Sequence, residues 1–154
     1  MNLTVEIEGL ERLRRRLDGL ARAFEGEAKR AALDSAETVR AEAMRALQEP
    51  RSGARPRRGG HRASAPGEAP ASDSGRLAGS LAAELDADGI SAWAGVRGPA
   101  ARGGAARYAA FLEFGTARMA ARPWLLPAFE RTRATIIERI RQGVGAALKS
   151  AGTS

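Results

Sequence analysis

The chain lacks cysteine, and its 154 residues include one histidine, one tyrosine and only 5% aromatic residues. The absence of cysteine excludes disulfide bonds and thiolate metal sites. No stretch approaches the ~18 consecutive apolar residues of a membrane-spanning helix. The opening residues MNLTVEIEGL also lack the basic flank and apolar run of a signal peptide. We therefore expect a protein that is made in the cytoplasm and does not interact with membranes.

The hydrophobic share of 44% includes a great deal of alanine. Alanine buries little apolar area per residue, so the hydrophobic core is expected to be modest. The length fits a single domain over residues 1–154. A chain of this kind often gains stability by burying further surface against copies of itself, which favours a homo-oligomer.

Most of the net charge of +7 lies in two short segments. Residues 51–62 carry five arginines and no acid, and residues 97–122 carry five arginines against Glu113 alone. Local basic segments suggest contact with a polyanion, most often nucleic acid. The alternative is that these are solvated loops on a generally basic background. The residues predicted to contact nucleic acid or a protein partner are Arg51, Arg55, Arg57, Arg58, Arg62, Arg102 and Arg107.

The first third of the sequence predicts one strand and two helices. Alternation of apolar and polar residues over 3–7 predicts a strand with one buried face. Apolar residues then recur at helical spacing from Leu10 to Phe24, with a break expected near Gly26. A second helix is predicted over about 27–48, packing on the sheet or, alternatively, against a neighbouring element or subunit. Its stripe is Ala28, Ala31, Ala32, Val39, Ala43 and Leu47.

The remainder predicts a long loop, a hairpin and two further helices. Residues 50–75 are rich in Gly, Pro, Ser and Arg and predict a flexible basic loop. A short amphipathic turn passes through Leu77 and Leu81. Asp88 followed by Gly89 then predicts a hairpin with a type I′ turn.

A short helix over 108–114 is expected to end at Gly115, and a long helix follows over 123–150. Proline in the first turn of that helix is tolerated. The apolar stripe of the long helix is Leu126, Phe129, Ile136, Ile137, Ile140, Val144 and Leu148. The fold class is therefore α+β. We expect a small antiparallel sheet, formed by the N-terminal strand and the hairpin, packed against two long helices and a short helix.

The sequence shows no set of residues suited to catalysis. His61 stands alone in the arginine-glycine loop, and GPAARGGAAR lacks the GK[ST] ending of a phosphate-binding loop. Asp86 and Asp88 flank a turn, where acidic residues are common. The second half of the chain has six acidic residues, too few for convergent carboxylates at a two-metal site. We expect binding or assembly rather than enzymatic activity, with no cofactor and no metal.

The aromatic residues are concentrated in YAAFLEFGTARMAARPWLLPAFE, residues 108–130. This stretch is either the core of the fold or a binding surface. We expect the core, with the aromatic side chains buried where two helices meet across a sharp turn at Gly115. Arg118 and Arg122 flank that turn and are expected to face a partner or to pair with Glu113. The aromatic residues predicted to be buried are Phe111, Phe114, Trp124 and Phe129.

This stretch resembles the signature of a family of long-tailed-phage proteins, the tail-completion or neck proteins related to the minor tail protein Z of phage lambda. The pattern is a tyrosine, a Glu-Phe-Gly-Thr element, Arg-Pro, an aromatic residue and Pro-Ala. Trp124 stands where phenylalanine is commoner. The matching residues are Tyr108, Glu113, Phe114, Gly115, Thr116, Arg122, Pro123, Trp124, Pro127 and Ala128, with Arg118 inside the same assembly signature.

A second match precedes it, over the family's Pro-Gly-Glu-x-Pro and Gly-x-Leu-x-x-Ser segments. The two blocks cover roughly residues 64–130 in the family's order, with a predicted hairpin between them. The arginine-rich insert at 51–62 departs from the pattern. The matching residues are Pro66, Gly67, Glu68, Pro70, Gly75, Leu77 and Ser80.

The resemblance implies a structural virion protein at the head–tail neck or tail end of a phage, a prophage or a gene transfer agent. Its implied partners are five further copies in a hexameric ring, neighbouring neck and tail-tube or terminator proteins, and packaged double-stranded DNA bound without sequence preference. Two alternatives are a small basic nucleic-acid-binding regulator and an assembly chaperone that leaves the finished particle. Against the regulator, no helix-turn-helix is visible and the aromatic residues are not interleaved with the arginines.

Overall fold

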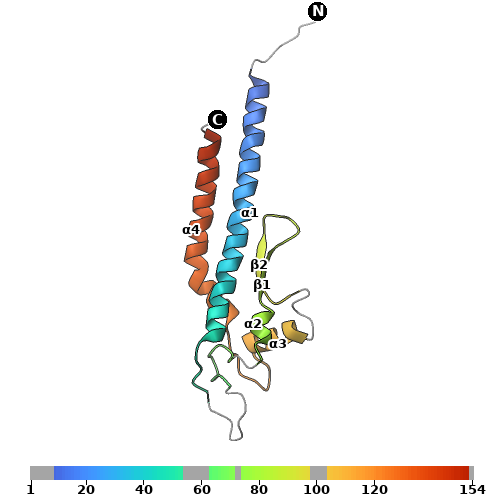
Figure 1. Ribbon diagram of the computed structural model, residues 1–154, viewed down its shortest axis with the longest axis vertical. Coiled ribbons are helices and arrows are strands. Elements are labelled where there is room, and N and C mark those ends of the chain that lie inside the picture. Colours follow the sequence, from blue (N-terminus) through green and yellow to red (C-terminus); the bar gives the residue numbers. More distant parts are fainter. Residues whose placement is uncertain (1–8, 54–62, 72–73, 98–103, 153–154) are drawn as a thin grey trace, which may run out of the picture.

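The computed structural model describes residues 9–53, 63–71, 74–97 and 104–152. It confirms the α+β fold class: two long helices, two short helices and a two-stranded antiparallel sheet. Figure 1 shows the long helices α1 and α4 side by side, with the hairpin on the other side of α1 and the short helices near one end. The strand predicted over 3–7 lies outside the described residues.

A single unbroken helix, α1 (Leu10–Gln48), replaces the two helices that the sequence predicted. The break predicted near Gly26 was wrong. A glycine in a helix interior costs only ~1 kcal/mol relative to alanine, and the surrounding Ala, Leu, Arg and Glu residues favour the helix. In addition, α4 lies directly against the next turn at Glu27 and Ala31. The helix ends at Glu49, whose extended backbone is the conformation that a following proline favours.

The second long helix, α4 (Leu125–Gly152), runs antiparallel to α1 along a seam of small residues. It starts two residues later than predicted, and Pro127 lies in its first turn as expected. A Cβ atom at Gly143 would lie only 3.7 Å from the Ala31 Cβ. Polar contacts edge the seam: Arg139 donates to the Asp34 carbonyl at 3.0 Å and to the Thr38 hydroxyl at 2.6 Å. The predicted alanine stripe of residues 28–47 is thus confirmed as a packing face.

The hairpin of β1 (Ala82–Leu85) and β2 (Ala92–Gly95) packs on α1. Its connection spans six residues, so the predicted two-residue type I′ turn was wrong. That turn requires a positive φ at Asp88, whereas the positive φ falls on Gly89 alone in this loop. The Asp88 carboxylate instead accepts the Ile90 and Ser91 N–H groups, and its hydrogen bonds to Ser91 lower the pKa of Asp88.

The core lies at the end of α1 where α2 (Arg76–Gly79) and α3 (Ala105–Phe114) gather. Trp124 is its only large side chain that is fully buried among the described residues. Among those residues, too, no helix has both the length and the apolar composition needed to cross a membrane. The buried cluster consists of Ala43, Leu47, Leu81, Ala109, Leu112, Trp124 and Ala128.

Candidate assembly surface

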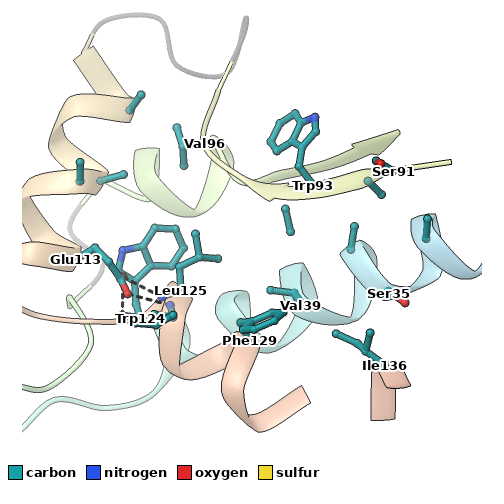
Figure 2. A pocket seen from close by; sticks show the side chains of 18 of the residues that line it. Ser35, Val39, Ser91, Trp93, Val96, Glu113, Trp124, Leu125, Phe129 and Ile136 are labelled. Atoms are coloured by element: carbon teal, nitrogen blue, oxygen red, sulfur yellow. Dashed lines mark hydrogen bonds between the residues drawn. The ribbon is translucent and has the colours of Figure 1, made fainter. Parts of the chain in front are cut away.

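Glu113, in the last turn of α3, caps the N-terminus of α4. The carboxylate is 9% exposed and accepts the N–H groups of Trp124 at 2.9 Å, Leu125 at 3.0 Å and Leu126 at 2.8 Å. The first N–H groups of a helix have no partner within the helix, and the helix dipole favours a negative charge there. One side chain therefore satisfies the start of α4 and joins it to α3 (Figure 2).

The chain between these two helices turns at Gly115, which has φ 74° and ψ −174°. This backbone region is essentially restricted to glycine. A Cβ atom at this position would also lie 2.8 Å from the Met119 carbonyl oxygen. The turn closes through the Thr116–Met119 bridge and a 2.7 Å hydrogen bond from the Arg122 N–H to the Leu112 carbonyl. The predicted helix end and positive φ at Gly115 are confirmed.

The two sequence blocks that resemble the phage family meet in space. The Gly67 N–H donates to the Ala121 carbonyl at 3.0 Å, and Arg122 Nε donates to the Ser64 carbonyl at 3.2 Å. Glu68 holds the upstream loop by accepting the Ala65 N–H at 3.0 Å together with the N–H and hydroxyl of Ser52. These hydrogen bonds, led by the Ser52 hydroxyl, lower the pKa of Glu68. The loop from Ser64 to Glu68 therefore packs on the turn before α4.

The predicted pairing of Glu113 with Arg118 or Arg122 was wrong. The Glu113 carboxylate accepts hydrogen bonds from backbone N–H groups, and the Arg122 guanidinium donates to the Ser64 and Ala120 carbonyls. Arg118 is exposed, and only its backbone N–H contacts the Thr116 hydroxyl, at 3.2 Å. Pro123 immediately precedes Trp124, the first of the three residues whose N–H groups Glu113 accepts. The signature therefore divides into groups that build the junction and groups that face outward.

Three of the four aromatic side chains that were predicted to be buried are exposed. Trp124 is 1% exposed, as predicted, but Phe111, Phe114 and Phe129 are 39%, 77% and 42% exposed. The buried cluster around Trp124 otherwise consists of alanine and leucine, while Phe114 and Phe129 line an open groove beside it. Tyr108 is exposed as well.

An open apolar groove of about 810 Å³ lies beside the cap. Its floor is α1 from Ala32 to Val39, one wall is the hairpin from Ile90 to Val96, and the opposite wall is α4 from Leu125 to Ile140. Residues of α3 from Ala106 to Phe114 line one end of the groove. Figure 2 shows Val39 and Phe129 on the α1 and α4 sides and Trp124 beside the cap. Glu113 is the one charged lining group, and the cap already uses it.

The N-terminal stripe of α1 and most of the α4 stripe are also exposed, contrary to the amphipathic packing that their spacing predicted. On α4, Ala128 and Ala147 face α1, while the larger residues lie to one side. On α1, the stripe before Gly26 faces solvent in the single chain. The exposed members are Leu10, Leu13, Leu17 and Phe24 on α1, and Leu126, Phe129, Ile137, Ile140, Val144 and Leu148 on α4.

Of the basic residues predicted to contact nucleic acid or a partner, Arg51 and Arg107 lie in the described part of the chain. The Arg51 side chain is only 8% exposed and lies 3.7 Å from the Glu49 carboxylate, so the prediction that Arg51 projects toward DNA was wrong. Arg107 is exposed, with its guanidinium 5.3 Å from the Phe111 ring centre. The other predicted contacts, Arg55, Arg57, Arg58, Arg62 and Arg102, lie outside the described residues.

The sequence patterns did not reveal the groove, because its walls come from four separate elements. The hairpin wall, with Trp93 and Ile90, carried no signal of its own. A usable signal was the excess of large apolar residues over what an alanine-rich core can cover. Within the described ranges, no group of three His, Asp or Glu side chains is placed to hold a metal. Comparison with protein-family models, curated proteins and solved structures finds no match to the chain.

Proposed function

We propose that the chain is a structural subunit of the head–tail neck or tail end of a phage, a prophage or a gene transfer agent, and that it forms a ring around the DNA channel. The resemblance to the phage family implies six copies in that ring. The observation that carries the proposal is the imbalance between covered and uncovered apolar side chains. Fourteen large hydrophobic residues of the described chain are more than a third exposed, whereas Trp124 alone among large side chains is fully buried.

This imbalance favours assembly over a free-standing role. Monomeric proteins seldom expose contiguous apolar patches larger than a few hundred Å². Here the groove and the stripe of α4 adjoin, since Leu126, Phe129 and Ile140 belong to both. Covering such a surface with further copies would supply burial that the alanine core lacks. A regulator that acts as a monomer would leave it open to solvent.

The signature residues support the same proposal in a different way. Glu113, Gly115 and Arg122 build the junction that orients α4, so they fix the shape of the subunit. Phe114 and Tyr108 of the same signature are exposed and available to partners. A signature of this kind fits a protein whose function is a defined shape with a defined contact surface.

The basic segment gives the ring its proposed contact with DNA. Arg55, Arg57, Arg58 and Arg62 would meet phosphates without regard to base sequence, as passage of any genome requires. Arg51 is excluded from this contact by its burial. The alternative partner is a neighbouring protein's carboxylates, to which arginine can bind in a bidentate manner.

Two measurements test the proposal. The chain should be found in purified particles by mass spectrometry, and recombinant protein should form closed rings with a central opening under the electron microscope. Absence from particles together with a monomer at the highest soluble concentration would exclude it. Replacing the four arginines by glutamine separates the contacts: lost DNA retention with intact assembly supports the DNA contact, and failed assembly supports the protein contact.

A further inference from the structure

The first turns of α1 form an arm whose large apolar side chains are exposed and lie beyond the other elements that the structure describes. We define the N-terminal arm as Leu10–Phe24. Its apolar residues Leu10, Leu13 and Leu17 are 55%, 53% and 56% exposed, and Phe24 is 46% exposed. Together with the half-buried Leu20 they recur every three or four positions, the spacing of anchors on a helix that lies in a groove. The antiparallel partner α4 is eleven residues shorter than α1, which has 39 residues to its 28.

The groove has the length of this arm. Along α4 its lining runs from Leu125 to Ile140, which is ~22 Å of helix at 1.5 Å per residue. The anchors from Leu10 to Phe24 span ~21 Å by the same measure. Both surfaces are apolar, and the groove offers no free charge because Glu113 is held in the cap. The arm and the groove therefore match in length and in polarity.

Their rims are also complementary in charge. Four arginines stand within residues 12–16 of the arm, and Arg14 and Arg16 flank its apolar stripe on the helix surface. The hairpin that forms one wall of the groove carries Glu84, Asp86 and Asp88 between residues 82 and 91. Asp86 already pairs with Arg97, which leaves Glu84 and Asp88 as the acidic groups without a basic partner on the hairpin. Opposite charges at the rim steer association and favour one partner over another.

The arm cannot occupy the groove of its own subunit. It is part of the same continuous helix that forms the floor, and Leu10 lies ~33 Å along the axis from Ala32 at 1.5 Å per residue. We propose that the N-terminal arm of one copy binds in the apolar groove of the next copy. This inference rests on the proposed self-assembly and names its interface. Because the two surfaces differ, the contact is head-to-tail, which is the type that closes into a ring when the rotation per copy permits.

Cross-linking tests the contact directly, since the chain has no native cysteine. One copy carries Leu17→Cys, in the middle of the arm, and a second carries Ile136→Cys, on the α4 wall. A short thiol-reactive cross-linker should join the mixed pair into heterodimers. The matched control pairs Ile136→Cys with Arg15→Cys, on the opposite side of the arm, and should yield at least ten-fold less cross-linked product.

A second pair of variants tests whether assembly depends on the arm. Leu13→Asp combined with Leu17→Asp should leave the circular dichroism spectrum and melting temperature of the subunit unchanged, because both side chains are exposed. Assembly measured by light scattering should be lost. Arg15→Asp, on the other side of the helix, should retain it.

Three other results would contradict the proposed contact between the arm and the groove. Rings that form without the mixed cross-link, or that survive the double aspartate variant, leave the proposed function standing but exclude this interface. Cross-links only between two Leu17→Cys copies indicate pairing of arms instead. A chain that stays monomeric under every condition removes both the interface and the proposed function.

Discussion

Removal of the Glu113 carboxylate should destabilise the subunit by about 3 kcal/mol. The Trp124 N–H lies in a site that is only 1% exposed, and an unsatisfied buried donor costs ~1–3 kcal/mol. The Leu125 and Leu126 N–H groups can bind water instead of Glu113. Loss of these two hydrogen bonds should therefore cost about as much as removal of an ordinary N-cap, ~1 kcal/mol. The free energy of unfolding of a typical domain is ~5–15 kcal/mol, so a loss of this size is large enough to measure.

The assay is urea unfolding of Glu113→Ala followed by far-ultraviolet circular dichroism, at one fixed low protein concentration so that assembly does not contribute. Glu113→Gln keeps the shape but has one acceptor oxygen and no charge, so it should fall between the wild type and alanine. Glu130→Ala removes an exposed carboxylate from α4 and serves as the control, with an effect within ~0.5 kcal/mol. A loss below about 1 kcal/mol for Glu113→Ala would show that the cap does not hold the junction.

Three further outcomes are expected. Trp124→Ala should cost ~3–5 kcal/mol in urea unfolding, whereas Phe129→Ala, 42% exposed, should cost roughly half as much, and equal costs would contradict the assigned burial. Gly115→Ala should cost more than ~1 kcal/mol, since its backbone region is nearly closed to alanine, and a neutral result in thermal melts would contradict the strain. The pKa of Glu68 is lowered in the fold, so its contribution is fully present above its ordinary value of 4.5 and is lost as the pH falls through the lowered value. Glu68→Gln should therefore remove part of the acid dependence of unfolding, and an unchanged pH profile would exclude the effect.

Sequence patterns predicted the elements better than their packing. Spacing of apolar residues located α4, the hairpin and the helix end at Gly115, because these depend on local conformational preferences. The spacing of apolar residues could not predict that α1 continues through Gly19 and Gly26. A local propensity of ~1 kcal/mol per glycine is overruled by a neighbour that is distant in sequence, here Gly143 of α4 against Glu27 and Ala31.

At the junction between α3 and α4, too, features set by local conformation were predictable and contacts between distant residues were not. Gly115 was predictable because its role is its own backbone angle. The role of Glu113 was not, because its partners lie 11 to 13 residues ahead and no fixed spacing links a carboxylate to the start of the next helix. The exposure of Phe114 was missed for a related reason. The sequence alone predicts that an aromatic residue at a helix end is buried, because it does not show how many large side chains the core can hold.

The alanine residues explain both the closeness of the helices and the exposure of the larger side chains. Ala43, Ala128 and Ala147 are 0–1% exposed, and at Gly143 the backbone of α4 comes close enough to Ala31 to leave little room for a larger side chain. Leucine, isoleucine and phenylalanine are therefore displaced to the flanks of the seam, where the groove and the stripes lie. A seam of small residues thus sets a short distance between the helices and buries little apolar area per residue. Under the proposed self-assembly, further burial would come from another copy of the chain, through an arm and a groove of similar length.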